Sequence, residues 1–414
     1  MATVVLMGTL DTKGREYGFI RDRLREWGTE VIVVDTGVLG RPLLEPDITR
    51  ADVARAAGAD VGDLVTAADR GSAIETMARG AVEVVRSLHG DGRLDGILAL
   101  GGSGGTSLAT PAMRALPVGV PKLMVSTVAS GDTRPYVGSS DLTMTYSVVD
   151  IAGLNQLSER ILANAAGAIA GMARAYRGHE PGAGTKPMVG ATMFGVTTPC
   201  VTAARERLEE LGYEVLVFHA TGTGGQSMEQ LMRDGFITAS LDITTTELAD
   251  ELVGGVFSAG PRRLEAAGEL GLPQVVSLGA LDMVNFGAPD TVPERFRQRR
   301  FYQHNPTVTL MRTTPDESRE LGHRIAGKLN RAGGPVTLFI PLRGVSQIAT
   351  EGQPFHDPAA DGALIGALTG DLDATVEVRE LDTDINDPVF ATAMADELHR
   401  LYGVWRRRHD EAGR

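Results

Sequence analysis

The sequence has few cysteines, no excess of basic residues and no long hydrophobic run. Cys200 is the only cysteine, which excludes an internal disulfide framework and a cysteine-rich metal site. Lys and Arg number 40 against 53 Asp and Glu, a net charge of −13 that argues against non-specific nucleic-acid or anionic-membrane binding. The most apolar helical stretch, 161–173, is interrupted by Asn164 and is too short to span a bilayer.

These absences favour a cytoplasmic enzyme or binding protein of ordinary composition. The first residues show no basic segment followed by an apolar core, so we expect no signal peptide and a cytoplasmic location. A length of 414 residues predicts about two domains. Glycine is abundant, at 51 residues, and many glycines directly follow apolar runs, where binding loops occur.

The order of apolar runs predicts the fold class. Residues 3–7 and 31–34 read as strands around a helix with apolar residues at helical spacing, which is a β-α-β unit with parallel strands. A linker with two Pro and three Gly occupies 178–187, and the strand-loop-helix pattern restarts at 188–194. We therefore predict two doubly wound, Rossmann-like α/β domains with mainly parallel sheets, at 1–180 and 181–414.

A glycine-rich loop follows the predicted strand 96–100 and precedes helix-competent residues. It contains Gly101, Gly102, Ser103, Gly104, Gly105 and Thr106. Backbone N–H groups in such a loop can converge on an anion, and the helix end adds partial positive charge, so a phosphate would fit. The alternative is a turn that only packs tightly. The loop has neither the lysine of a Walker motif nor the dinucleotide pattern G-x-G-x-x-G.

Three further loops follow predicted strands of the same half, and at the sheet edge they would join the glycine-rich loop in a nucleotide site. They contain Gly8, Thr9, Asp11, Thr12 and Lys13, then Asp35 and Thr36, then Val128, Ala129, Ser130, Gly131 and Asp132. Lys13 offers a charge for a phosphate, Asp11 or Asp132 could hold magnesium, and Asp35 could accept from ribose hydroxyls. Alternatively, Asp11 and Asp35 only cap helices or turns.

The second half carries polar residues in predicted loops that could act as acids and bases. We name Asp282, Asn285, His304 and Glu351 as candidate catalytic residues, with His219 and His356 in similar loops. Their spacing matches no zinc signature, so the identity of any metal ligands stays open. We expect them to face the nucleotide loops across an interdomain cleft and to bind a small second substrate. The alternative is a set of surface and turn residues whose polar groups satisfy the backbone.

Taken together, these motifs resemble the tomato mosaic virus resistance protein-like ATP-binding family over essentially the whole chain. The resemblance rests on GTLDTK (8–13), VVDTG (33–37), GGSGGT (101–106), STVASGD (126–132), GALDMVNF (279–286), HNP (304–306) and the segment 351–361. It implies two Rossmann-like subdomains, ATP bound in the first, and a homodimer. It supplies no reaction.

Three functions therefore remain open. The first is ATP binding with Mg²⁺-dependent phosphoryl-transfer or hydrolytic chemistry on a small second substrate. The second is a non-catalytic module in which ATP orders a binding surface. The third, an NAD(P)-dependent oxidoreductase, is disfavoured because the first loop lacks G-x-G-x-x-G.

Overall fold

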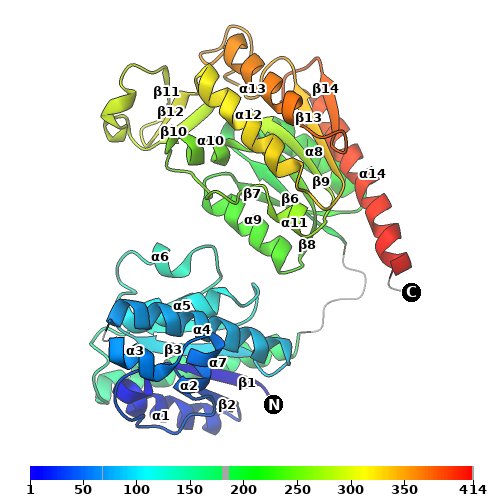
Figure 1. Ribbon diagram of the computed structural model, residues 1–414. Helices are drawn as coiled ribbons and strands as arrows, with labels where there is room; N and C mark the ends of the chain where they lie inside the picture. Colours follow the sequence, from blue (N-terminus) through cyan, green and yellow to red (C-terminus); the bar gives the residue numbers. More distant parts are fainter. Residues whose placement is uncertain (68, 180–185, 413–414) are drawn as a thin grey trace. The chain divides into compact units, whose positions relative to one another are not determined.

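The computed structural model describes residues 1–67, 69–179 and 186–412, in two compact units, Met1–Gly182 and Ala183–Arg414 (Figure 1). Most of the predicted linker, and the predicted boundary at 180, lie outside the described residues. Each unit has its own parallel sheet and its own hydrophobic clusters, so the two are described separately.

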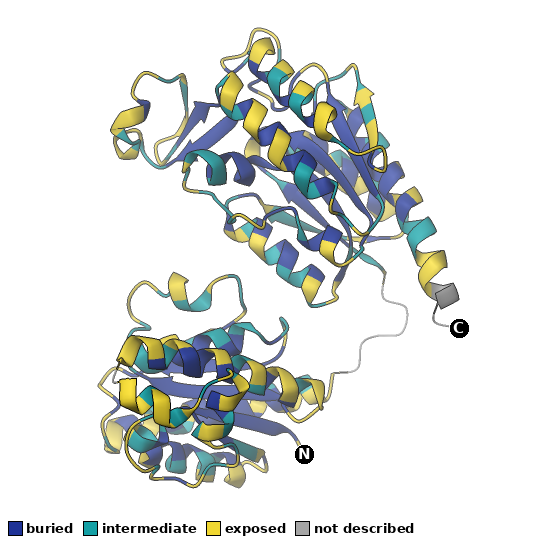
Figure 2. Ribbon diagram, viewed as in Figure 1, coloured by how far each residue is buried: buried dark blue, intermediate teal, exposed yellow. Residues whose placement is uncertain are grey.

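The N-terminal unit is built on a five-stranded parallel sheet in the order β2-β1-β3-β4-β5. The strands are β1 (Thr3–Gly8), β2 (Glu30–Asp35), β3 (Gly96–Gly101), β4 (Lys122–Ser126) and β5 (Thr143–Tyr146). Every residue of the three central strands is buried, as the continuous apolar runs of a doubly covered sheet require (Figure 2).

Helices cover both faces of this sheet. They are α1 (Leu10–Glu26), α2 (Arg50–Ala56), α3 (Val61–Ala67), α4 (Arg70–Gly90), α5 (Ser103–Arg114), α6 (Arg134–Val137) and α7 (Gln156–Arg177). α1 and α7 share one hydrophobic core with the sheet, while α2, α4 and α5 share another. The sequence of residues 146–150 alone would predict a strand there, but β5 ends at Tyr146, and Val148 has a φ of 64°, outside the extended region.

Strand order fixes where a ligand can enter this sheet. The connections run one way from β1 to β2 and the other way from β3 onward, so the order reverses between β1 and β3. The loops that leave the carboxyl ends of these two neighbouring strands therefore diverge to opposite faces. In open α/β sheets the crevice between such loops is the usual ligand position.

The C-terminal unit repeats this order with one more strand, as β14-β13-β9-β8-β6-β7. The strands are β6 (Met188–Met193), β7 (Glu214–His219), β8 (Ile237–Thr244), β9 (Gln274–Gly279), β13 (Val336–Pro341) and β14 (Glu377–Leu381). The helices are α8 (Thr198–Glu210), α9 (Thr223–Arg233), α10 (Thr246–Val253), α11 (Ala266–Glu269), α12 (Pro315–Leu329), α13 (Pro358–Asp371) and α14 (Pro388–Ala412). The predicted fold class, two α/β domains with parallel sheets, is confirmed.

A small antiparallel sheet, β10-β12-β11, was not predicted as a whole. Its strands are β10 (Met283–Phe286), β11 (Phe301–Asn305) and β12 (Val308–Arg312). Only the last is apparent from the sequence, as the mostly apolar run 308–311. The expectation that Asn285 and His304 lie in loops was therefore wrong, and it was also wrong for His219, which is the last residue of β7. β10 is only four residues long, and β11 is polar and largely exposed, so neither shows the apolar alternation by which strands are recognised.

Membrane-spanning helices are not found among the described residues: none of their helices is both long and apolar enough to cross a bilayer.

Candidate nucleotide site

A cavity of about 680 Å³ lies at the reversal between β1 and β3. Nine of the predicted nucleotide-site residues line it: Thr9, Asp11, Thr12, Lys13, Thr36, Gly102, Ser103, Gly104 and Gly105. Gly8, Asp35, Gly101 and Thr106 are buried beneath it and do not line it. The structure thus brings three of the four predicted loops together at one sheet edge.

The glycine-rich loop presents the start of α5 to this cavity. Its first intrahelical bond runs from Thr106 N to Gly102 O (2.9 Å), so the N–H groups of residues 103–105 precede the hydrogen-bonded ladder. No side chain of the described residues caps this helix end. A Cβ on Gly101 would lie 2.9 Å from the Gly105 Cα, so the loop folds this tightly only with glycine.

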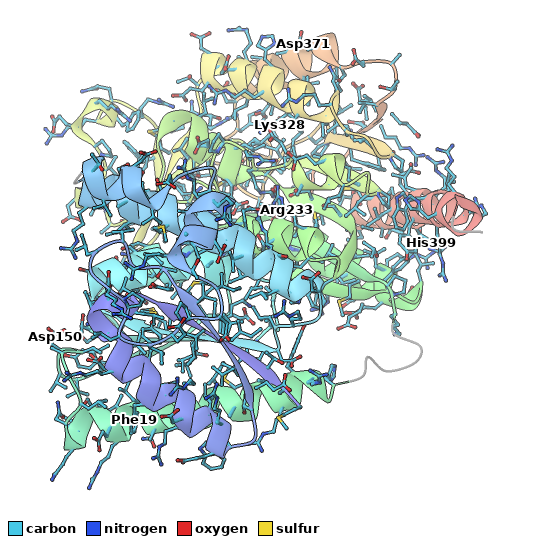
Figure 3. The ribbon with its side chains drawn as sticks, turned by 60° about the horizontal axis from the view of Figure 1, so that its bottom comes forward. Phe19, Asp150, Arg233, Lys328, Asp371 and His399 are labelled. Atoms are coloured by element: carbon cyan, nitrogen blue, oxygen red, sulfur yellow. The ribbon has the colours of Figure 1, made fainter. Side chains whose placement is uncertain are left out.

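The loop after β1 is held by contacts between its own side chains and with a distant segment. The hydroxyl groups of Thr9 and Thr12 are 2.7 Å apart, and Lys13 Nζ donates to the carbonyl oxygen of Ile151. Lys13 departs from helical geometry, with φ −127° and ψ 19°. Asp150, the residue before Ile151 in the segment after β5, also lines the cavity and is labelled in Figure 3.

Two polar atoms beside the cavity lack a hydrogen-bond partner in the described part of the chain: Asp11 Oδ1 and Thr36 Oγ1. The other carboxylate oxygen of Asp11 accepts from Leu39 N at 2.9 Å and lies 3.7 Å from Arg50 Nη1. A Cβ on Gly37 would lie 2.7 Å from this carboxylate, so glycine permits the close approach. Buried polar atoms left without partners are suited to bind a ligand.

Asp35, expected to meet ribose, is instead committed to the backbone around the cavity. One carboxylate oxygen accepts from Leu10 N (3.2 Å) and Gly37 N (2.9 Å), and the other pairs with Arg50 Nε (2.8 Å). Its side chain is 1% exposed. This arrangement matches the alternative interpretation, in which the aspartate holds turns in place.

The fourth predicted loop, 128–132, does not line this cavity. Val128 N donates to Ser126 Oγ, which turns the chain away directly after β4. Asp132 is exposed, and its hydrogen bonds with the Arg134 guanidinium lower its pKa to about 2. An exposed carboxylate already paired with arginine offers little to a magnesium ion bound elsewhere.

Sequence reasoning missed the far wall of the cavity, which comes from the long connection between β2 and β3. It contributes Val38, Leu39, Leu64, Val65, Asp69, Arg70, Ala73, Ile74 and Met77. A Cβ on Gly104 would lie 3.3 Å from Arg70 Nη2, which places this guanidinium over the glycine-rich loop. No carboxylate of the described residues pairs with Arg70. No sequence motif predicts this wall, because its apolar residues are scattered over a long loop and two helices.

No hydrogen bond or ion pair among the described residues joins the four candidate catalytic residues to one another, and each has its own surroundings. Asp282 is buried and accepts from Ser346 Oγ at 2.8 Å, and burial raises its pKa to about 6. Asn285 is buried and donates from Nδ2 to Asp250 at 2.5 Å. His304 is exposed on β11, with Nε2 3.6 Å from a Cβ placed on Gly195, and Glu351 is exposed in a turn.

Metal binding by these residues finds no support. Among the described residues, no three His, Cys, Asp or Glu side chains gather as a metal site. Cys200 is buried at the start of α8, and burial raises its pKa, which favours the thiol over the thiolate. The catalytic role assigned to the four residues stays a prediction.

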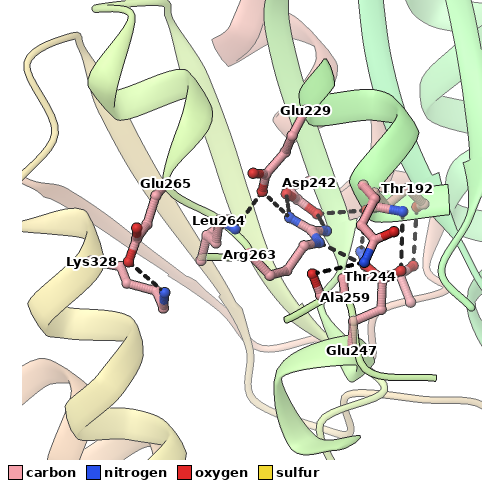
Figure 4. A network of polar contacts seen from close by, with 12 residues as sticks. Thr192, Glu229, Asp242, Thr244, Glu247, Ala259, Arg263, Leu264, Glu265 and Lys328 are labelled. Atoms are coloured by element: carbon pink, nitrogen blue, oxygen red, sulfur yellow. Dashed lines mark hydrogen bonds and ion pairs between the residues drawn. The ribbon is translucent and has the colours of Figure 1, made fainter. Parts of the chain in front are cut away.

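The second glycine-rich run, 222–227, differs from the first because the protein fills it with its own carboxylate. Glu247 Oε1 accepts from the N–H groups of Gly222 (2.7 Å) and Gly225 (3.0 Å), while its other oxygen pairs with Arg263 Nε at 2.6 Å (Figure 4). This run also follows β7, the second strand of its unit, whereas 101–106 follows the third. The backbone N–H groups of these glycines therefore bind the carboxylate of Glu247.

Arg263 is the centre of this buried network. It makes two bonds of 2.6 Å to Asp242 and lies 3.5 Å from Glu229, in addition to its bond with Glu247. Its side chain is 1% exposed. One guanidinium thus holds three carboxylates from β8, α9 and α10, which ties these elements together.

The comparisons with protein families match both units. The profile described as Uncharacterised protein family (UPF0261) N-terminal domain matches residues 2–178, and the corresponding C-terminal domain profile matches 186–402. A UPF0261 protein of Clostridium tetani is 54% identical over 95% of this chain and 98% of its own length. A UPF0261 protein of Mesorhizobium japonicum is 47% identical over the same shares.

A plant relative confirms the resemblance drawn from the motifs. The ToMV resistance protein Tm-1(GCR237) of Solanum lycopersicum is 48% identical over 80% of this chain, which corresponds to 44% of the tomato protein. Among solved structures, UDP-N-acetylglucosamine 2-epimerase from Rickettsia bellii is similar over 66% of this chain and 78% of its own, with 13% identity and a TM-score of 0.23. So low a score supports no inference about function.

Proposed function

The chain belongs to the UPF0261 family, and we propose that its N-terminal unit binds ATP in the cavity between the loops of β1 and β3. One observation carries the proposal: an open glycine-rich helix start and an apolar wall line the same cavity. A nucleotide needs both, because its phosphates seek N–H donors and cations while its base seeks apolar contact. The volume of about 680 Å³ lies in the range of small-molecule sites.

In this proposal the phosphates lie at the start of α5. The N–H groups of residues 103–105 and the helix dipole favour an anion there. Arg70 lies over the same loop without a carboxylate partner in the described chain, and Lys13 lines the cavity from the β1 side. Two cations beside three backbone donors suit a polyphosphate better than a single phosphate.

The adenine ring would pack on the apolar wall. Val38 and Leu39 follow β2, Leu64 and Val65 come from α3, and Ile74 and Met77 come from α4. Burial of an aromatic ring against such side chains contributes by the hydrophobic effect, without directional requirements. Asp69, at the start of α4, already accepts from Gly71 N and Ser72 N with Oδ1, so this oxygen is committed to the helix cap.

Magnesium would enter with the nucleotide. Mg²⁺ prefers one or two carboxylates together with phosphate oxygens and water. Asp11 fits this requirement, because it lines the cavity and its Oδ1, although buried, has no hydrogen-bond partner among the described residues. Asp11 would therefore hold the ion, directly or through water.

The proposal leaves two alternatives for the bound ATP, chemical reaction or binding alone. We retain Mg²⁺-dependent phosphoryl transfer or hydrolysis on a small second substrate as the first candidate. A non-catalytic ATP-responsive module is the second, supported by the internal hydrogen bonds that already engage the buried Asp282 and Asn285. A homodimer in the cytoplasm completes the proposal; the buried free thiol of Cys200 is compatible with a reducing compartment.

Thermal unfolding with added nucleotides tests the proposal. The full chain is heated with ATP, ADP, AMP or NAD, each with and without Mg²⁺, and phosphate release is followed in parallel samples. We expect ATP with Mg²⁺ to raise the melting temperature most, since a ligand at 100 times its Kd stabilises the folded state by about 2.7 kcal/mol. Phosphate release would support an enzyme, and a shift without release would support a module. A shift with NAD alone would overturn the proposal.

A further inference from the structure

We propose that the groove between α4 and α5 is a second ligand site, which takes a small organic anion next to the terminal phosphate of the nucleotide. The proposal rests on the proposed ATP site for its neighbour, but the groove itself is defined by its own residues. It places a second ligand on the N-terminal unit. The candidate catalytic residues of the C-terminal unit keep their own predicted role.

The groove has a volume of about 750 Å³, which is the size of a complete small-molecule site. Small residues make up much of its lining: Gly71, Ala78, Gly104, Ser107 and Pro111. Ile74 and Val82 supply apolar contact from α4. A ligand can therefore lie along the two helices in contact with both.

Two arginines give the groove its charge. Among the described residues, Arg70 pairs with no carboxylate. Over the same residues, the Arg79 guanidinium donates only to Thr76 Oγ1, at 3.3 Å. Both guanidinium groups retain donors for a carboxylate or phosphate, which they recognise in a planar, two-pronged geometry. Glu75 also lines the groove without an ion pair among the described residues, so the formal charge of the lining is +1.

The groove adjoins the proposed nucleotide cavity. Arg70, Ile74, Ser103 and Gly104 line both spaces. The inner end of the groove therefore meets the start of α5, where the phosphates are proposed to lie. An anion held by Arg79 would lie beyond Arg70, and Arg70 would stand between the two ligands and screen their charges from one another.

The chemistry of the lining selects the ligand class. Two guanidinium groups favour a carboxylate or a phosphate ester, while the lone Glu75 carboxylate disfavours excess negative charge unless the ligand also carries a hydrogen-bond donor. Carboxylate and phosphate compounds share this recognition, so the test uses one probe of each kind.

The experiment titrates malonate and, separately, inorganic phosphate into the full chain saturated with a non-hydrolysable ATP analogue. Arg79→Gln is compared with Arg86→Gln, a control on the same helix whose guanidinium pairs with Glu83 at 3.2 Å and does not line the groove. We expect Arg79→Gln to weaken binding about tenfold, as loss of a charge-assisted hydrogen bond does, and Arg86→Gln to leave it unchanged. Glu75→Gln should tighten binding of both probes, because it removes a repelling charge.

Several results separate this inference from the proposed function. Equal weakening by Arg79→Gln and Arg86→Gln, or no binding of either probe to a protein that binds the ATP analogue, would overturn the groove site and leave the ATP site standing. If the analogue does not bind, the same titrations are run without it. Probe binding that depends on Arg79 would then support the groove although the ATP proposal had failed, and its absence would overturn both.

Discussion

Lys13 donates a hydrogen bond from Nζ to the backbone carbonyl of Ile151, which ties the loop after β1 to the segment after β5. The ammonium group is thus engaged with a neutral acceptor at the edge of the cavity. A phosphate is a stronger acceptor than a carbonyl because it is charged. Nucleotide binding would therefore draw Lys13 from Ile151 toward the phosphates and loosen the segment around Asp150.

Lys13→Ala should weaken ATP more than AMP. Loss of a hydrogen bond to a charged group costs about 1.5–3 kcal/mol, which is about a ten- to hundredfold change in Kd. Only a nucleotide that reaches Lys13 with its β- or γ-phosphate should show this loss. Calorimetric titration of both nucleotides into both proteins gives the comparison; equal weakening would place Lys13 at the α-phosphate or away from the ligand.

Replacement of Arg263 should destabilise the C-terminal unit strongly. Arg263→Met leaves Asp242 and Glu247 buried without their cation and leaves Glu229 with Arg233, 3.6 Å away. Breaking a buried charge network costs about 3–5 kcal/mol. Arg262→Met is the matched control, because its exposed side chain pairs at the surface with Glu269 and should change stability little. Urea unfolding of the three proteins measures the difference, and similar midpoints for both variants would contradict it.

Asp250 should make stability fall as the pH rises. Burial raises its pKa from 3.8 to about 7, so the folded state holds a proton that the unfolded state releases. The stabilisation from this group is complete below pH 3.8 and is lost as the pH passes about 7, by about 1.4 kcal/mol for each unit of pKa shift.

Asp250→Asn provides the comparison. Asn285 Oδ1 has no hydrogen-bond partner in the described residues and can accept from the new amide after its own amide rotates. Unfolding free energies of both proteins at pH 4.5 and 8 should therefore differ in their pH dependence, with the steeper loss in the wild type. Identical pH dependence would show that Asp250 keeps the same pKa in both states.

The fold and the glycine-rich side of the site could be predicted from the sequence because both depend on local patterns. Each central strand is a continuous apolar run, and the glycines at 101–105 follow one directly. The place of these loops at one edge then follows from parallel topology alone. The β1 loop and Thr36 reach the cavity for the same reason.

The other wall and the small antiparallel sheet could not be predicted, since tertiary contacts decide them. Arg70 reaches the cavity only because α4 packs beside α5, and nothing in its neighbourhood distinguishes it from other helix-start arginines. Asp35 has the sequence position of a ribose ligand, but Arg50 and two backbone N–H groups take its oxygens. β11, the polar strand that contains His304, forms because it pairs with β12 (Val308–Arg312), and the residues of β11 alone do not predict this pairing.

The central claim is that ATP phosphates lie at the start of α5, and Gly104→Val tests it most directly. A Cβ at Gly104 points at Arg70 Nη2 (3.3 Å) and Ile74 Cδ1 (3.6 Å), so the valine methyl groups would enter the cavity. Gly171→Val is the control, since a Cβ there meets nothing within 4 Å and Gly171 lies within α7.

The measurement is the ATP affinity of the wild type and both variants, by calorimetric titration with Mg²⁺ present, with the melting temperature of each protein recorded alongside. The proposal predicts that Gly104→Val remains folded and loses ATP binding, while Gly171→Val binds ATP as the wild type does. A folded Gly104→Val protein with unchanged ATP affinity would contradict the proposed site.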